Sequence, residues 1–136
     1  MPFATTAEAI ARRNIITVDD NDSVFDAISL MVTESIGCIV VTSRGRPVGI
    51  ITERDLMRKV ILQGMDTKQV LTREIMSTPL ITINADASLG EAALMMYDKR
   101  IRRLLVEKGG NIIGIFTQRD LENAALGYFL AVAKIT

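Results

Sequence analysis

The chain has 136 residues, with 16 basic and 16 acidic side chains, one cysteine, no histidine and no tryptophan. The absence of imidazole excludes a Ser-His-Asp triad, a Cys-His dyad and a histidine metal site. One cysteine excludes an internal disulfide and a multi-thiolate zinc site. Hydrophobic residues make up 49% of the chain, enough for a folded core, and the balanced charge leaves no overall basic field for nucleic acid or an anionic membrane.

Neither end of the sequence carries a targeting or membrane signal. Residues 1–6 lack a charged region followed by an apolar stretch, so we expect no secretory signal. The longest apolar segment, residues 124–133, is about half the ~20 residues that a membrane helix needs. We therefore expect no membrane association and a cytoplasmic location.

The first predicted elements are a strand and a helix. The extended segment 15–18 is followed by polar, turn-forming residues 19–22. Ser23 comes next, with Asp26 three residues later, which predicts a capping box at the start of a helix. Apolar residues then recur at helical spacing, at Val24, Ala27, Ile28 and Met31.

A hairpin and a second helix complete the first half. The β-branched run 39–41, a glycine-bearing turn at 43–47 and a strand at 48–51 predict a hairpin with a loop of three to five residues. The strand leads directly into a helix that we expect to end near Gly64. Residues 65–73 then link the two halves of the chain.

The second half repeats this order at an offset of 65 residues. Of the 47 aligned positions from 10 to 56, 15 are identical to their counterparts, several times more than chance would give. The repeat predicts a strand at 80–83 and a capping box formed by Ser88 and Glu91. It also predicts a hairpin with strands at 104–106 and 112–116. We place the domains at residues 1–68 and 69–136, packed around one core, because ~60 residues alone bury too little surface to be robust.

One motif could carry chemistry, and it closes the second strand of the hairpin in each repeat. It reads Gly-Ile-Ile-Thr-Glu-Arg-Asp-Leu at 49–56 and Gly-Ile-Phe-Thr-Gln-Arg-Asp-Leu at 114–121. The structural interpretation is a helix cap, with threonine at the N-cap and aspartate three residues later. The functional interpretation adds that a helix N-terminus binds anions and that a carboxylate one turn in can accept both hydroxyls of a ribose. The motif alone supports nucleotide binding only weakly.

A cluster of cations precedes the strand expected at 104–106, in the second repeat. Lys99 and Arg100 suit a solvated helix end, where cations interact with the helix dipole. Arg102 and Arg103 fit that explanation less well, because consecutive strand residues point to opposite faces. Since the first repeat has Gly37 and Cys38 at the equivalent positions, the duplication did not require charge there. This local excess of cations on a neutral protein is typical of a phosphate pocket.

These motifs, with Ile-Arg-Arg-Leu-Leu-Val at 101–106 and Glu-Ile-Met-Ser at 74–77, resemble a tandem pair of cystathionine-β-synthase-type (CBS) domains, also called a Bateman module. The resemblance implies a mixed α/β (α+β) fold of two β-α-β-β-α units packed about a pseudo-twofold axis. It also implies two clefts that bind an adenosine nucleotide (AMP, ADP or ATP) or S-adenosylmethionine as a regulatory ligand, with no cofactor, metal or catalytic residue. One departure from the family pattern is Ala11, where the second repeat has Met76.

By resemblance, each cleft draws residues from both repeats, with aspartate on the ribose, threonine and arginines on the phosphates, and aliphatic residues on the adenine. The first cleft would combine Ile50, Thr52, Asp55, Leu80, Ile81, Arg102, Arg103 and Arg119. The second would combine Ile115, Thr117, Asp120, Ile15, Ile16, Gly37, Cys38 and Arg54. Because the second lacks the arginine pair, we expect it to bind phosphates more weakly, to accept a less charged adenosyl group or to stay empty.

Three other functions remain open on the sequence. A ligand-free module for homodimerisation or for docking a separate regulated protein is supported by apolar residues on one helical face, at Leu121, Ala124, Ala125, Tyr128, Phe129 and Val132. The alternative for that stripe is packing on its own sheet. An enzyme is disfavoured because no nucleophile has an adjacent base. Nucleic-acid binding is disfavoured because aromatic residues make up only 4% of the chain.

Overall fold

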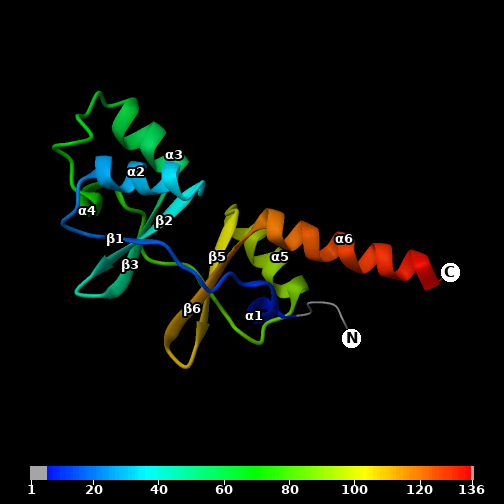
Figure 1. Cartoon of the computed structure of the whole chain (residues 1–136). Helices are drawn as coiled ribbons and strands as arrows, with labels where there is room; N and C mark the ends of the chain where they lie inside the picture. Colours follow the sequence, from blue (N-terminus) through cyan, green and yellow to red (C-terminus); the bar gives the residue numbers. More distant parts are fainter. Residues whose placement is uncertain (1–5, 136) are drawn as a thin grey trace. The chain divides into compact units, whose positions relative to one another are not determined.

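The computed structural model describes residues 6–135, which form two compact units (Figure 1). One unit is the continuous segment Ile15–Leu80. The other combines the N-terminal segment up to Asn14 with the segment from Ile81 onward. The units therefore do not follow the repeat boundary expected at 68/69, because each repeat's entry segment belongs to the unit formed mainly by the other repeat.

The 15–80 unit is a three-stranded sheet with helices on it. Strand β2 lies in the middle, parallel to β1 and antiparallel to β3. Helix α3 continues without a break into the π-helix η1. The elements in chain order are β1 (Thr17–Asp19), α2 (Val24–Thr33), β2 (Cys38–Ser43), β3 (Arg46–Thr52), α3 (Glu53–Asp55), η1 (Leu56–Ile61) and α4 (Thr72–Ile75).

The other unit has the same sheet topology, with β5 between the parallel β4 and the antiparallel β6. Its last helix is a regular α-helix of 18 residues. Its elements are α1 (Ala7–Ile10), β4 (Thr82–Asn84), α5 (Leu89–Lys99), β5 (Arg103–Lys108), β6 (Asn111–Thr117) and α6 (Gln118–Ile135). Within residues 6–135 there is no helix with the length and hydropathy to span a bilayer.

The predicted β-α-β-β-α order is confirmed in both repeats, with differences in detail. Ser23 and Ser88 cap their helices, each accepting a hydrogen bond from the backbone amide three residues ahead, which is the serine half of the predicted capping boxes. The hairpin loops are shorter than the expected three to five residues. Strand pairing continues to the two-residue loops Arg44-Gly45 and 109–110, whose residues all have positive φ. Positive φ at both loop positions gives a turn whose twist matches the strands.

Each unit has its own hydrophobic core on one face of its sheet. In the 15–80 unit, Ile39, Val41 and Ile51 pack with residues of α2 and η1. In the other unit, Leu104 and Phe116 take the equivalent places. Because strand residues alternate between faces, the residues between these core positions lie on the opposite face of the sheet.

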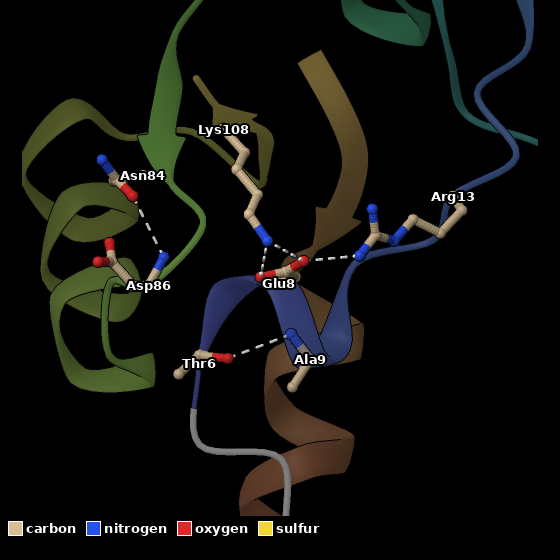
Figure 2. A network of polar contacts seen from close by, with 7 residues as sticks. All are labelled: Thr6, Glu8, Ala9, Arg13, Asn84, Asp86 and Lys108. Carbon is tan, nitrogen blue, oxygen red and sulfur yellow. Dashed lines mark hydrogen bonds and ion pairs between the residues drawn. The ribbon is translucent and has the colours of Figure 1, made fainter. Parts of the chain in front are cut away.

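The one-turn helices α1 and α4 were not predicted from the sequence. The amides of Ala7 and Glu8 donate to the carbonyls of Ala87 and Ala85, which fixes α1 beside β4. Figure 2 shows the Glu8 carboxylate between two cations, Lys108 at 3.1 Å and Arg13 at 2.8 Å. Hydrogen bonds lower the pKa of Glu8 below its usual range, the larger contribution from Lys108 and the smaller from Arg13.

A glycine in each unit allows the segment after the one-turn helix to approach the sheet. A Cβ added at Gly49 would lie 2.6 Å from the sulfur of Met76, and one at Gly114 would lie 2.8 Å from the Cβ of Ala11. The segment beyond each contact then forms an antiparallel bridge, between Ile50 and Ser77 and between Ile115 and Arg12. Ala11, the departure from the family pattern, therefore occupies the same place against Gly114 that Met76 occupies against Gly49.

Candidate functional site

The Thr-x-x-Asp motif of the first repeat forms a complete capping box where β3 turns into α3. The Asp55 amide donates to Thr52 Oγ1 at 3.1 Å, and Asp55 Oδ2 accepts from the Thr52 amide at 3.0 Å. The Thr52 hydroxyl also donates to the same carboxylate oxygen, at an Oγ1–Oδ2 distance of 3.2 Å. The structural interpretation of the motif is thus confirmed, and it uses one of the two carboxylate oxygens.

The second oxygen of Asp55 is also held. Oδ1 accepts from Ser77 Oγ at 2.8 Å and forms an ion pair with Lys59 Nζ at 3.0 Å. Lys59 lies one turn along, on η1, and its ammonium also donates to the carbonyl of Ile75 at 2.9 Å. Asp55 is 7% exposed, so this carboxylate is buried but fully hydrogen-bonded.

The second repeat forms the same box with a different partner. The Thr117 amide donates to Asp120 Oδ2 at 2.9 Å, and the Asp120 amide donates to Thr117 Oγ1 at 3.3 Å. Asp120 Oδ1 accepts from Arg12 Nη2 at 2.7 Å. Arg12 and Ser77 are equivalent in the 65-residue repeat, so one position supplies a guanidinium in one unit and a hydroxyl in the other.

Both aspartates are held ionised by their surroundings. Burial alone would raise the pKa of Asp55, but the Thr52 amide, Lys59 and Ser77 outweigh it and hold the pKa below its usual range. Burial opposes ionisation of Asp120 in the same way, and there the Thr117 amide and Arg12 lower the pKa. Two ionised carboxylates at helix N-termini are suited to accepting hydrogen bonds rather than to donating protons.

The sheet register places several predicted site residues beside these boxes. Thr52 pairs with Cys38, and Ile50 lies two residues before Thr52, on the face opposite the core. In the other unit, Ile115 and Thr117 hold the same positions, and Thr117 pairs with Arg103. Arg103 thus lies opposite the threonine of its own repeat, and its Nε is buried without a hydrogen-bond partner among residues 6–135.

The remaining predicted residues differ in exposure. The side chains of Ile16 and Ile81 pack partly against the core of their own units, so much of their apolar surface is already covered. Three arginines and four less polar residues complete the set. Arg54, Arg102 and Arg119 are exposed, and Ile15, Gly37, Cys38 and Leu80 are half-buried. Each predicted cleft draws on both units, and those combinations stay predictions.

Sequence reasoning missed Lys59, Ser77 and Arg12, the residues that contact the two aspartates. Ser77 and Arg12 follow the unpredicted one-turn helices, and their contacts depend on backbone bridges between distant segments. The repeat does contain one relevant signal. At the offset of 65 residues Ser77 aligns with Arg12, so a contact made by one of them predicts an equivalent contact for the other.

Comparison with known proteins gives the family. The family model for the CBS domain matches residues 7–62 and again residues 72–127. An uncharacterised protein of Methanopyrus kandleri is 41% identical over 114 residues, covering 82% of this chain and 58% of its own length. Inosine-5'-monophosphate dehydrogenase of Methanocaldococcus jannaschii is 33% identical over 117 residues, or 85% of this chain but 22% of the enzyme. The chain thus spans little more than half of the first relative and a small part of the second.

Solved structures agree with this assignment. A protein with CBS domains from Burkholderia ambifaria matches with a TM-score of 0.86 and 36% identity, covering 90% of this chain and 95% of that one. A hexameric CBS-CP12 protein from bloom-forming cyanobacteria matches with a TM-score of 0.80 and 31% identity, covering 89% and 68%. The two matched segments, the repeated sheets and these structural neighbours establish that the chain belongs to the CBS domain family and carries two CBS domains in tandem.

Proposed function

We propose that this CBS pair is a regulatory module that binds an adenosine nucleotide (AMP, ADP or ATP) or S-adenosylmethionine and acts as an energy or metabolite sensor. The observation that carries the proposal is the pair of ionised aspartates, each beside a threonine at a helix N-terminus. CBS domains occur in proteins of different functions, including the dehydrogenase and the hexameric protein above, which suits a regulatory role.

The chemistry follows from what each group offers. An ionised carboxylate accepts two hydroxyl hydrogen bonds, and ribose presents a pair of neighbouring hydroxyls. To accept them, Asp55 would exchange its contacts with Ser77 and Lys59, and Asp120 would exchange its contact with Arg12. Arg103 begins β5, Arg102 directly precedes it, and the two supply cations for phosphates. Ile50 and Ile115 present apolar surface on the same sheet face as the threonines, which suits an adenine ring.

We propose that the module has no catalytic activity of its own. A general acid must release a proton near neutral pH, whereas Asp55 and Asp120 both have lowered pKa values. The chain contains no histidine that could serve instead. Catalysis would then belong to a separate regulated protein.

Calorimetric titration tests the proposal. Wild type, Asp55→Asn and Asp120→Asn would be titrated with AMP, ADP, ATP and S-adenosylmethionine. Asparagine keeps the size of the side chain and one acceptor, so both variants should fold. Each variant is expected to lose one binding site. Ligand at about 100 times its Kd should stabilise the wild type by roughly 2.7 kcal/mol in a thermal unfolding assay. A flat response to all four ligands would reject the function, and unchanged binding in both variants would reject the site assignment.

A second candidate function, a dimerisation or docking module, is supported by α6. Leu121 packs against the core of its unit, but Tyr128, Phe129 and Val132 farther along the helix are exposed. Leu126 and Leu130 are exposed as well, so apolar residues surround the distal part of the helix rather than forming one stripe. Helices that are apolar on all sides are normally covered. Sedimentation that shows a monomer at high concentration would argue against a homodimer.

A further inference from the structure

The two aspartates differ in how firmly their second oxygen is held. Lys59, which pairs with Asp55, also donates to the carbonyl of Ile75 and lies 3.4 Å from Ser77 Oγ. An ammonium has three N–H groups, so all three have an acceptor within the same unit. Asp55 Oδ1 is therefore in contact with two donors, the Ser77 hydroxyl and the Lys59 ammonium.

Asp120 Oδ1 is covered by the single guanidinium of Arg12. The Arg12 side chain is 66% exposed, whereas that of Asp120 is 11% exposed. Because most of the Arg12 side chain lies in water, its guanidinium can exchange the carboxylate for water or for another anion without disturbing the capping box. The Asp120 site can therefore open by a single side-chain rotation.

The backbone of Arg12 is fixed beside the strand that leads to Thr117. The Arg12 amide donates to the carbonyl of Ile115 at 2.8 Å, and the Ile115 amide donates to the carbonyl of Arg12 at 3.1 Å. This two-bond bridge holds the Cα in place while the long side chain remains free to turn. A group that displaces the guanidinium from Asp120 therefore stays within reach of the same arginine.

We propose that Arg12 is a specificity-determining residue of the Asp120 site, covering the carboxylate when no ligand is bound and pairing with a ligand phosphate when a ribose takes its place. This inference rests on the proposed nucleotide-binding function and says which ligands the Asp120 site prefers. A phosphorylated nucleoside replaces the ion pair with another ion pair. A neutral nucleoside leaves the guanidinium without an anionic partner.

Arg12 changes the expected phosphate affinity of the Asp120 site, which lacks the arginine pair. Gly37 and Cys38 carry no charge, which predicts weak phosphate binding on that side. Arg12 supplies a cation from a different segment, while the equivalent position at Asp55 is the neutral Ser77. The Asp120 site would then favour phosphorylated ligands despite lacking the arginine pair.

The test compares AMP with adenosine by calorimetric titration in an Asp55→Asn background, which leaves only the Asp120 site. Arg12→Ser installs the residue found at the equivalent position of the other repeat. Arg13→Ser is the matched control, because it removes the same charge from the adjacent residue, which pairs with Glu8 instead (Figure 2). Arg12→Ser is expected to weaken AMP binding about tenfold, since it removes a charge-assisted hydrogen bond to the phosphate, and to leave adenosine binding unchanged or slightly tighter. Arg13→Ser should leave the ratio of the two affinities as it is.

The outcomes separate this inference from the function on which it rests. If the wild type binds neither AMP nor adenosine, the proposed function and the inference both fail. If it binds, but Arg12→Ser leaves the AMP-to-adenosine ratio unchanged or weakens both ligands equally, only the inference fails. Binding that disappears in Asp55→Asn but survives in Asp120→Asn would also overturn it. Arg12→Lys keeps the charge and should retain most of the preference for AMP, and unfolding curves would show that all variants fold.

Discussion

The Asp55 and Asp120 boxes show which features of a duplicated site stayed the same and which changed. In both repeats the threonine and aspartate exchange the same pair of backbone hydrogen bonds with nearly the same lengths. The group that reaches the outer carboxylate oxygen differs, a serine with a lysine in one unit and an arginine in the other. The inner oxygen thus has the same role in both caps, whereas the outer oxygen accepts from a hydroxyl and an ammonium in one unit and from a guanidinium in the other.

The path of the chain explains why that outer partner can vary. Lys59 comes from η1, but Ser77 and Arg12 come from the segments after α4 and α1, each of which crosses the sheet at a glycine and makes a single bridge. Few other contacts constrain the side chain at this position. Sites that depend on such a segment can change their electrostatics without a change in the fold.

The largest expected effect comes from adding a methyl group where this segment crosses the sheet. Gly114→Ala should lower the free energy of unfolding by about 3 kcal/mol, because the new Cβ meets the Cβ of Ala11 and the backbone carbonyl of Arg12, which cannot move aside. Gly49→Ala should cost only about 1 kcal/mol, because its nearest neighbour is the flexible end of Met76. Urea unfolding followed by circular dichroism measures both.

A double variant checks the reason for that difference. Met76→Ala should recover part of the loss caused by Gly49→Ala, since it removes the sulfur that the new methyl group meets. Ala11→Gly should recover less in the Gly114→Ala protein, because the Arg12 carbonyl remains 3.0 Å from the added Cβ. Equal costs for the two glycine variants would show that the crossing segments adapt equally well, and would contradict the comparison.

Much of this fold could be predicted from the sequence, because its signals are local. Hydrophobic spacing and serine caps located α2 and α5, and the repeated motif placed a capping box at the end of β3 and of β6. Strands β1 and β4 begin two residues later than expected, and directly before them Ile16 and Ile81 each accept one hydrogen bond from the neighbouring strand through their carbonyls. Amino-acid composition does not indicate at which residue an edge strand of this kind begins its regular pairing.

The aspartates of the site could be predicted, but their partners could not. Thr52 and Asp55 are three residues apart, so their contact follows from helix geometry. Arg12 and Asp120 are 108 residues apart, and their contact requires that α1 pack on the second repeat's sheet. The sequence pattern of Ala7–Ile10 is one helical turn, too short to show a periodicity that would indicate its packing surface.

The next effect concerns how the two carboxylates respond to acid. Because the folded-state pKa of Asp55 lies below its unfolded value of ~3.9, its contribution to stability is complete above that pH and is lost as pH falls through the folded pKa. The pKa of Asp120 is also lowered in the folded state, so its contribution to stability depends on pH in the same direction. Asp55→Asn should therefore cost about 2 kcal/mol at pH 7 and Asp120→Asn about 1 kcal/mol, since Asp55 loses two outer partners and Asp120 one.

Urea unfolding at pH 7, 4 and 3 checks this ordering. The gap between the wild type and each asparagine variant should narrow as the pH falls, because the wild-type carboxylate then becomes neutral as well. Glu53→Gln is a suitable control, since Glu53 is exposed and lies in the same short helix. A gap that stays constant with pH would show that packing rather than charge accounts for the loss.

The smallest expected effect distinguishes the two hairpin turns. Arg44 has φ of 52° in the β2–β3 turn, whereas the equivalent position in the β5–β6 turn is Gly109 at 59°. A positive φ costs an ordinary L-residue about 1 kcal/mol, and asparagine tolerates it better. Arg44→Asn should raise the free energy of unfolding by about 0.5 kcal/mol, and Gly109→Arg should lower it by a similar or larger amount. Because both positions are exposed and lie at the end of the hairpin opposite the capping boxes, neither change should alter nucleotide binding. If Arg44→Asn is instead destabilising, the arginine makes a favourable interaction in this turn that outweighs its backbone strain.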